Sequence, residues 1–349
     1  MNIPSSSELL INGLSPVSLA LAVILSKHGI KVLLIDDHSV IEPQFDQIIV
    51  DTYSIEFLKN HGFNFSKEEV SNTYLKSTEF INQALKLLAT NLCSVIWDTK
   101  ITDSKAANTQ FILSHQAQLT IHSTTYFYLS SDLKFGIIKL DFRNIFLLAW
   151  RLIGILKGTL KKPILESYPT EYILLRTQFL ANDESTKKNV FQRLIHKYVN
   201  THSAPNLIES KTSLHLSQHR SLQAGELLPD LPFYDEKAKV NSSLHQWCSY
   251  QHFSVIIFGY LIPANLFAIA KWMQLNYPVQ LYYLPNSERN ESLFKELKLS
   301  IGQKKTLIVR PDKYIGLLHD GIEIDLMDNY LRNFIFMNEK TTDDRLLSE

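Results

Sequence analysis

The fold is decided by the stretch Glu8-Leu-Leu-Ile-Asn-Gly-Leu-Ser-Pro-Val-Ser18, which we predict to form the first strand and the turn after it. An amphipathic segment continues to Gly29, and a second apolar run occupies Lys31-Val-Leu-Leu-Ile-Asp36. Strand, turn, helix and strand in this order are typical of a dinucleotide-binding βαβ unit. The sequence therefore predicts an α/β protein that begins with a Rossmann-like domain.

Gly13, Ser15 and Ser18 stand at the spacing of the three glycines in the pattern G-x-G-x-x-G. Those glycines permit, in order, a tight turn, close approach of the backbone to a pyrophosphate, and close packing of the helix on the strand. Serine adds a Cβ atom and a hydroxyl group at the second and third positions. We therefore expect dinucleotide binding to be weakened rather than abolished.

Asp36 ends the second predicted strand, at about the usual 20 residues beyond the glycine turn, where dinucleotide-binding folds place an acidic residue. A carboxylate at this point accepts hydrogen bonds from a ribose. In the alternative interpretation, Asp36 and Asp37 only end a strand of a Rossmann-like core that holds no ligand. Both interpretations stay open on this segment alone.

Composition and charge argue against several kinds of partner. The 349 residues include 35 Lys and Arg against 35 Asp and Glu, without a long block of either sign, so we expect no nucleic-acid partner. The most apolar stretch, residues 145–156, contains Arg151 and is shorter than the roughly 20 residues that cross a bilayer. The first residues lack the features of a secretory signal. We expect a cytoplasmic protein of about two domains with no membrane contact.

The cysteines and histidines give no pattern for a disulfide or a metal site. Cys93 and Cys248 lie far apart without C-x-x-C spacing, which favours two independent thiols. His215 and His219 have i, i+4 spacing, but they fall in a segment that we predict to be extended, and only a continuous helix would bring them together. We expect no metal ion.

Apolar periodicity predicts the order of the remaining elements. In the first part we expect a long helix from an Asp141 cap to Lys157, preceded by helices at 51–61 and 79–92 and by an antiparallel meander of strands at 94–101, 110–114 and 119–129. In the last part we expect a small α/β domain with strands at 252–259, 278–284 and 305–310 and helices at 263–276 and 291–299.

Three further stretches carry a resemblance to a known family. They are Leu140-Asp-Phe-Arg-Asn-Ile-Phe-Leu-Leu-Ala-Trp-Arg-Leu152, Ala224-Gly-Glu-Leu-Leu-Pro-Asp-Leu-Pro232 and Val309-Arg-Pro-Asp-Lys-Tyr-Ile-Gly316. The first is similar to the helix Asp-Ala-x-Asn-Leu-x-Trp-Lys-Leu of the FAD-dependent aromatic-ring hydroxylases. The other two resemble the entry to, and the last strands of, the thioredoxin-like C-terminal domain in the phenol hydroxylase branch. Together with the opening βαβ unit, the chain thus resembles this family from residue 8 to residue 316.

The resemblance implies a degenerate FAD-binding Rossmann-like domain with an antiparallel meander at 1–200, an extended connector at 201–248 and a thioredoxin-like domain at 249–349. It implies that FAD lies against residues of the first domain, namely Gly13, Ser15, Ser18, Asp36, Asp132, Asp141 and Asn144. At Asp141 we favour helix capping over a retained flavin contact. The resemblance also implies NAD(P)H as the reductant, a phenolic or polycyclic aromatic substrate, and a homodimer formed through the C-terminal domain.

One departure from the family concerns catalysis. Ser131-Asp132 resembles the end of the family's meander, which a large sheet domain follows over the aromatic substrate, yet only eight residues separate Asp132 from Asp141. Several strands of the ordinary five to six residues do not fit into this interval. We therefore expect a monooxygenase relative whose catalysis is impaired or lost. The alternative is a non-catalytic scaffold or dimerising interaction protein.

Overall fold

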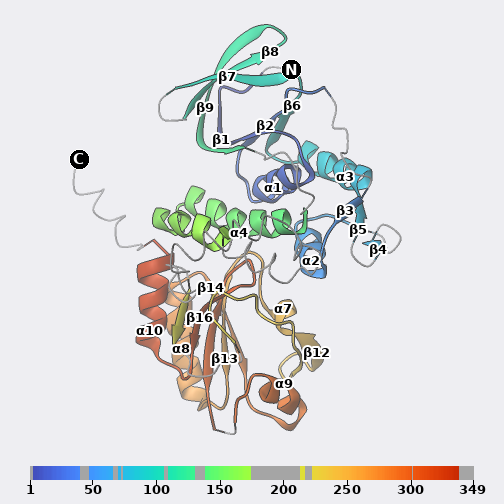
Figure 1. The fold of residues 1–349 in the computed structure, drawn as a ribbon. Coiled ribbons are helices and arrows are strands. Elements are labelled where there is room, and N and C mark those ends of the chain that lie inside the picture. The colour runs from blue at the N-terminus through green and yellow to red at the C-terminus, as the bar shows by residue number, and fades with distance from the viewer. Residues whose placement is uncertain are drawn as a thin grey trace, which may run out of the picture. The chain divides into compact units, whose positions relative to one another are not determined.

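The computed structural model describes residues 3–39, 47–65, 70–71, 74–105, 109–129, 138–173, 213–216, 222–300 and 302–337. The chain forms two compact units, Met1–Leu156 and Lys157–Glu349 (Figure 1). This boundary lies earlier than the predicted one at residue 200. The reason is that residues just after it bond to the end of the second unit: the N–H of Lys161 donates to the carbonyl of Ile335 at 3.0 Å.

The first unit is built on a six-stranded sheet of order β6-β2-β1-β9-β8-β7. Strands β1 (Ser6–Asn12), β2 (Val32–Ile35), β6 (Cys93–Ile96) and β9 (Gln118–Leu129) are parallel to their neighbours within this group. β7 (Thr99–Lys105), β8 (Gln110–His115) and β9 pair antiparallel. Helix α1 (Pro16–Lys27) joins β1 to β2, as the sequence predicts.

The predicted strand 94–101 is two strands, β6 and β7, which is a correction to the sequence analysis. Asp98 between them has a φ of 49°, a left-handed conformation that Asp tolerates better than most residues. This turn lets β6 pair parallel with β2 and leaves β7 to begin the antiparallel part. A left-handed residue has no signature in the apolar alternation of the stretch, so the division was not predictable from that pattern.

Both faces of the first unit's sheet are covered. On one face, α1 contacts helices α3 (Ser77–Ala89) and α4 (Ile138–Leu156), and every residue from Val17 to Ser26 is buried. On the other, Leu10, Leu33, Ile35 and Ile96 pack with Phe111 and Leu113 of β8, so the sheet curls over itself (Figure 1). Helix α1 is buried on all sides because it contacts the sheet on one side and helices α3 and α4 on the other sides, which suits its apolar sequence.

The remaining elements of the first unit lie around α4. Helix α2 (Thr52–Asn60) stacks Phe57 on Phe146 of α4, with ring centroids 3.8 Å apart. Its N-cap, Asp51, accepts a hydrogen bond from the Ser54 N–H at 2.8 Å and forms an ion pair with Arg143 at 2.6 Å. A small sheet of order β3-β5-β4 completes the unit, with bounds Gln47–Ile49, Tyr74–Lys76 and Val70–Ser71.

Asp141 is not the N-cap of the long helix, so that prediction is wrong. Helix α4 begins at Ile138, and Asp141 lies inside its first turn. Ile138, Phe142 and Ile145 follow the i, i+4, i+7 spacing of an apolar helix face, which extends the helix toward its N-terminus. At the other end, Gly158 has a φ of 71°, which suits the residue that stops a helix.

The second unit contains a five-stranded sheet of order β10-β16-β15-β13-β14. In chain order its strands are β10 (Leu214–Leu216), β13 (Phe253–Phe258), β14 (Val279–Leu284), β15 (Lys305–Val309) and β16 (Ile315–His319). β13 is parallel to β14 and antiparallel to β15, and β15 is antiparallel to β16. After β13, Gly259 has a φ of 97°, and a Cβ atom there would collide with the Gln303 carbonyl oxygen.

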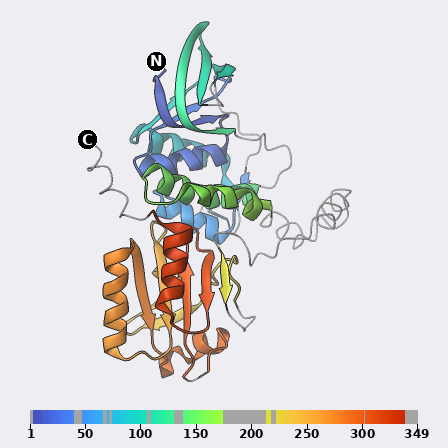
Figure 2. The same ribbon diagram turned by 90° about the vertical axis from the view of Figure 1, so that its left-hand side faces the viewer.

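Helices of the second unit stand beside this sheet (Figure 2). They are the long α8 (Pro263–Asn276), the short α9 (Glu291–Glu296) and α10 (Ile324–Asn329), which runs on into a π-helical turn at Tyr330–Ile335. Two 3-10 turns lie at Lys162–Ser167 and Glu288–Asn290. The strands and helices predicted between residues 252 and 310 are found at nearly the predicted places.

Part of the predicted connector 201–248 belongs to the fold of the second unit. Leu214–Leu216 is the sheet strand β10, which pairs parallel with β16. A hairpin of β11 (Pro232–Asp235) and β12 (Val240–Ser243) leads into the short helix α7 (Leu244–Trp247). Side chains from this region are fully buried in the core of the unit, among them Ala224, Leu228 and Leu244. Short, packed elements therefore occupy part of the segment that the sequence analysis expects to be extended.

A cluster of buried charges closes the turn between β15 and β16. The Arg310 guanidinium is 1% exposed and donates to both oxygens of Asp312, at 3.0 and 2.8 Å. Its third nitrogen donates to Glu171 at 2.8 Å. Bidentate pairing of this kind gives strong, directional hydrogen bonds. The cluster ties the residues that follow the 3-10 turn at Lys162–Ser167 to the sheet of the same unit.

No helix within the described ranges combines the length and the apolar character that a membrane span requires.

Candidate nucleotide-binding turn

The turn between β1 and α1 has the backbone form of a dinucleotide-binding turn. Gly13 has a φ of 100°, a region that L-residues rarely adopt, and its N–H donates to the carbonyl of Ile35 on β2 at 2.9 Å. The first glycine of the sequence pattern is thus used for the tight turn that it predicts. Helix α1 then starts with Pro16 in its first turn, where a missing N–H costs no intrahelical bond.

Ser15 and Ser18 form a reciprocal capping box at the start of α1. The Ser18 N–H donates to the Ser15 hydroxyl at 3.1 Å, and the Ser15 N–H donates to the Ser18 hydroxyl at 2.7 Å. The Ser18 hydroxyl in turn donates to the Ser15 carbonyl at 3.0 Å. Amide groups at a helix N-terminus are the donors that bind phosphate in this fold class. Here two of them are satisfied by the chain itself.

Asp36 contacts the same turn from the end of β2. One of its carboxylate oxygens accepts the Leu14 N–H at 2.6 Å. The other accepts the N–H and the ring Nδ1 of His38, both at 2.9 Å. The Asp36 side chain is 12% exposed, whereas His38 is 77% exposed. The carboxylate that is predicted to accept hydrogen bonds from a ribose therefore already accepts them from Leu14 and His38.

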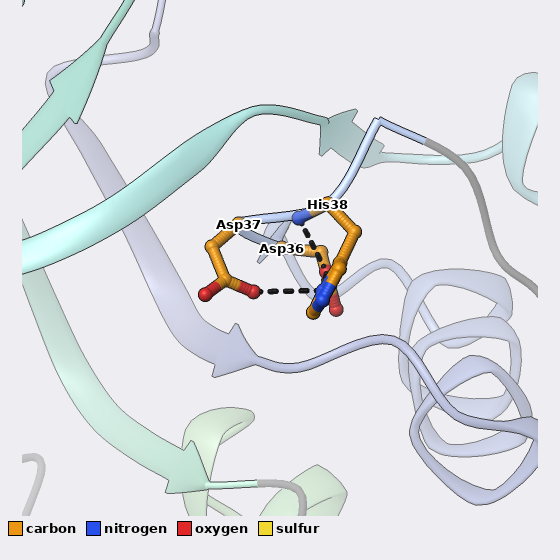
Figure 3. Close-up of side chains that lie close together, drawn as sticks. All are labelled: Asp36, Asp37 and His38. Carbon is orange, nitrogen blue, oxygen red and sulfur yellow. Dashed lines mark hydrogen bonds and ion pairs between the residues drawn. The ribbon is translucent and has the colours of Figure 1, made fainter.

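Asp36, Asp37 and His38 bring three metal-ligating side chains close together, because His38 Nδ1 also lies 2.9 Å from an Asp37 oxygen (Figure 3). Asp37 and His38 face solvent, and consecutive acidic residues commonly gather in this way at a strand end. The hydrogen bonds of the three residues to each other account for their arrangement.

The structure brings together four of the seven predicted cofactor residues: Gly13, Ser15, Ser18 and Asp36. Asn144 lies on α4, where it is half-buried, and Asp141 lies in the first turn of that helix. Asp132 lies outside the described residues. The sequence did not indicate Leu14 or His38 as site residues. Leu14 contributes its backbone N–H to Asp36, and His38 contributes its backbone N–H and its ring Nδ1 to the same carboxylate. No residue pattern announces either contact.

The residues of the turn do not fit the pyrophosphate of FAD in this arrangement. A pyrophosphate needs backbone donors and a site free of negative charge. The N–H groups of Gly13, Leu14, Ser15 and Ser18 all have acceptors within the chain. The acceptor of the Leu14 N–H is a carboxylate, which adds a charge of the same sign as the phosphates.

The chain passes from β9 to α4 within eight residues, because β9 ends at Leu129 and α4 begins at Ile138. A sheet domain cannot be formed by a connection of this length. The short interval expected from the sequence is therefore present between these two elements.

The other residues singled out in the sequence lie in structural settings. Burial raises the pKa of the Cys248 thiol to about 11 and that of Cys93 to about 12, so both are neutral thiols at physiological pH. Trp150 is buried in the core. His122 is buried too, donates from Nδ1 to the Pro4 carbonyl at 2.7 Å and lies 2.9 Å from the Ser7 hydroxyl. The side chains of His215 and His219 lie outside the described residues.

Comparison with known proteins gives a match in structure and none in sequence. Neither a protein-family model nor a curated protein sequence matches the chain. Among solved structures, aklavinone-11 hydroxylase in a ternary complex with FAD and aklavinone matches with a TM-score of 0.67 and 11% identity, over 96% of this chain and 100% of that one.

Two further hydroxylases match similarly. The anhydrotetracycline hydroxylase OxyS from Streptomyces rimosus has a TM-score of 0.60 and 13% identity, over 95% of this chain and 100% of its own. CabE, an aromatic hydroxylase from angucycline biosynthesis, has a TM-score of 0.60 and 9% identity, over 93% and 98%. The structural neighbours of the chain are thus FAD-dependent aromatic hydroxylases. At these identities the likeness is one of fold.

Proposed function

We propose that this chain is a protein of the FAD-hydroxylase fold that does not hydroxylate an aromatic ring by itself. The observation that carries the proposal is the eight-residue passage from β9 to α4. In flavin enzymes the cofactor carries the oxygen chemistry, while the protein orients the substrate and keeps out competing reactions. A sheet inserted at this passage would enclose a phenolic or polycyclic ring beside the cofactor, and eight residues are too few to form one.

The inherited cofactor is FAD and the inherited reductant is NAD(P)H. The fold match to FAD-dependent hydroxylases supports FAD, and the closed turn at Ser15 and Ser18 supports weak binding. We expect purified protein to lose its flavin during preparation. The proposal thus combines an inherited fold with a reduced affinity for the cofactor of that fold.

An activity assay with added FAD tests the proposal. Purified protein is mixed with excess FAD, NADH or NADPH, oxygen and a panel of phenols and polycyclic aromatics, with aklavinone-11 hydroxylase and aklavinone as the positive control. We expect any oxidised NAD(P)H to be matched by hydrogen peroxide, with no hydroxylated aromatic above the level that free flavin gives. A hydroxylated product formed in proportion to the NAD(P)H consumed would refute the proposal.

A second candidate function, that of a dimerising scaffold, has its own observation. The second unit has the strand order β16-β15-β13-β14 with helices after β13, β14 and β16, which supports a thioredoxin-like domain. Its helix α8 carries two exposed apolar side chains, Phe267 at 70% and Leu275 at 71%, beside the edge strand β14. Large exposed apolar groups of this kind favour a protein interface.

Sedimentation tests this second candidate. The double variant Phe267→Ser and Leu275→Ser should convert a dimer to a monomer while the far-ultraviolet circular dichroism stays unchanged. The matched control is Leu119→Ser, which removes an equally exposed apolar side chain, 70% exposed, from the first unit. A wild-type protein that sediments as a monomer at tens of micromolar would exclude the dimer.

A further inference from the structure

We infer that the turn between β1 and α1 admits an uncharged nucleoside and gains no affinity from a pyrophosphate, and that the Ser15 and Ser18 pair sets this preference. The inference deepens the proposed function, because it rests on the turn being the inherited nucleotide site. It gives the weak binding a specific chemical form: the phosphates of a ligand add no affinity here.

The serine hydroxyls stand where phosphate oxygens would accept hydrogen bonds. The Ser15 hydroxyl receives the Ser18 N–H at 3.1 Å, and the Ser18 hydroxyl receives the Ser15 N–H at 2.7 Å. A phosphate can use these donors only after it displaces both hydroxyls. Ser18 is fully buried, and its hydroxyl also donates to the Ser15 carbonyl at 3.0 Å, so displacing that hydroxyl breaks a further hydrogen bond.

The Asp36 carboxylate closes the remaining approach. It accepts the Leu14 N–H at 2.6 Å, so the donor that precedes the serine pair is already bound to a negative charge. A pyrophosphate placed here would meet a carboxylate of the same sign instead of an open amide. Pro16, which lies between the two serines, has no N–H to offer in compensation.

The same carboxylate leaves room for a neutral ribose. Its hydrogen bonds to Leu14 and His38 use three acceptor positions, and an ionised carboxylate has about four. One ribose hydroxyl group can therefore donate to Asp36 without displacing any contact. The amides of Leu14, Ser15 and Ser18 are bonded within the chain, so a diphosphate meets fewer donors here than in an open turn.

The decisive experiment compares adenosine, ADP and FAD by isothermal titration on the full-length protein. We expect adenosine and ADP to bind the wild type with affinities equal within about threefold. In the double variant Ser15→Gly and Ser18→Gly, ADP should bind about tenfold tighter than in the wild type, because charge-assisted hydrogen bonds to the freed amides become available. Adenosine should bind the variant as it binds the wild type.

Two controls separate the site from general effects on the helix. Ser26→Gly places a glycine in the same helix, at a buried serine whose hydroxyl bonds only to the Val23 carbonyl at 3.2 Å, and should leave all three affinities unchanged. Ser18→Ala removes the hydroxyl yet keeps the Cβ atom, and should give a smaller gain for ADP. This single variant retains a readout if the double glycine variant is too unstable to titrate.

Several results would overturn the inference. They are wild-type binding of ADP about tenfold tighter than adenosine, no wild-type binding of adenosine, or equal gains for adenosine and ADP in the glycine variant. The proposed function fails separately, through tight stoichiometric binding of FAD or coupled hydroxylation. Tight FAD binding with ADP no better than adenosine would leave the present inference standing, since the flavin half would then supply the affinity.

Discussion

Two turns in this molecule satisfy their polar groups in different ways. The turn between β1 and α1 receives its backbone amides with two neutral serine hydroxyls and, at Leu14, with the Asp36 carboxylate. The turn between β15 and β16 is held by ion pairs between buried side chains, with Arg310 bound to Asp312 and Glu171. The first turn has the form of a ligand site, and the second has the form of a structural joint.

The difference determines which of the two turns tolerates substitution of its polar side chains. Removing a hydroxyl at Ser15 or Ser18 leaves a neutral amide that water or a ligand can satisfy. Removing Arg310 takes from the buried carboxylates of Asp312 and Glu171 the positive charge that they share, and breaking a buried ion pair from one side is strongly destabilising. The ligand-like turn is therefore adjustable, while the joint is fixed.

The largest expected effect comes from breaking the joint. Arg310→Met should lower the free energy of unfolding of the second unit by about 3–5 kcal/mol, because Asp312 and Glu171 remain buried and lose the guanidinium that both contact. Urea unfolding followed by hydrogen exchange in β13 and β15 measures the change. Arg332→Met is the control: it breaks a half-exposed pair with Asp328 and should cost far less than Arg310→Met. An equal loss of unfolding free energy in Arg310→Met and Arg332→Met would contradict the distinction between the buried charge cluster and the surface ion pair.

The next effect concerns the first unit and depends on pH. Burial lowers the pKa of His61 from 6.5 to about 4, and its Nδ1 donates to the Phe57 carbonyl at 2.8 Å. The unfolded chain therefore binds the proton more strongly between these values. The free energy of unfolding of the first unit should fall as pH drops from about 6.5 to about 4, by roughly 3 kcal/mol.

Variants at two histidines separate the contributions to this pH dependence. Burial also lowers the pKa of His122, so that residue contributes in the same direction. His61→Phe should flatten most of the slope, as seen in urea midpoints measured at half-unit pH steps. If the slope is unchanged in His61→Phe and lost in His122→Phe, then His122, and not His61, is the source of the pH dependence.

A smaller effect tests the capping box as a stabilising element. Ser15→Ala should lower the free energy of unfolding of the first unit by about 1 kcal/mol, whereas Ser15→Gly should cost only a few tenths, because glycine is tolerated at an N-cap and alanine is not. Thermal melts of the two variants side by side give the comparison. Equal stability of Ser15→Ala and the wild type would show that the box does not hold the helix end.

The smallest effect is expected at the cysteines. Both thiols have a pKa raised by burial, so neither should react appreciably with a thiol reagent at pH 7 in the folded protein, and Cys248→Ser should leave ligand binding unchanged. Reaction with an aromatic disulfide reagent, with and without urea, measures this. Rapid labelling of native Cys248 would reveal access to the core of the second unit.

The sequence allowed much of the fold to be predicted because the signals were local. Gly13, Pro16 and Gly29 punctuate the first helix, and apolar alternation locates β13, β14 and β15. The predicted cap at Asp141 is wrong because an acidic residue suits the first turn of a helix as well as its cap, through attraction to the helix dipole. A residue type alone does not distinguish the two positions.

The candidate site was harder to predict because its contacts are reciprocal. Ser15 and Ser18 stand at the places of two glycines, but no pattern in the sequence indicates that each hydroxyl bonds to the other residue's amide. Capping boxes usually pair Ser or Thr with Glu or Gln, so a serine at the second place does not signal one. The bond from Leu14 to Asp36 joins residues 22 apart through a backbone atom, which no side-chain pattern encodes.

The short passage from β9 to α4 also bears on how the first unit reaches its fold. β9 pairs with β1 and α4 contacts α1, so both elements must close onto the same βαβ unit. The entropy lost in closing a flexible connection grows with its length, by about 0.6 kcal/mol for each doubling. With only eight residues between Leu129 and Ile138, α4 can dock as soon as β9 is in place. We expect this unit to fold faster than the same unit carrying a domain inserted at that point, because its contacts join residues closer together along the chain.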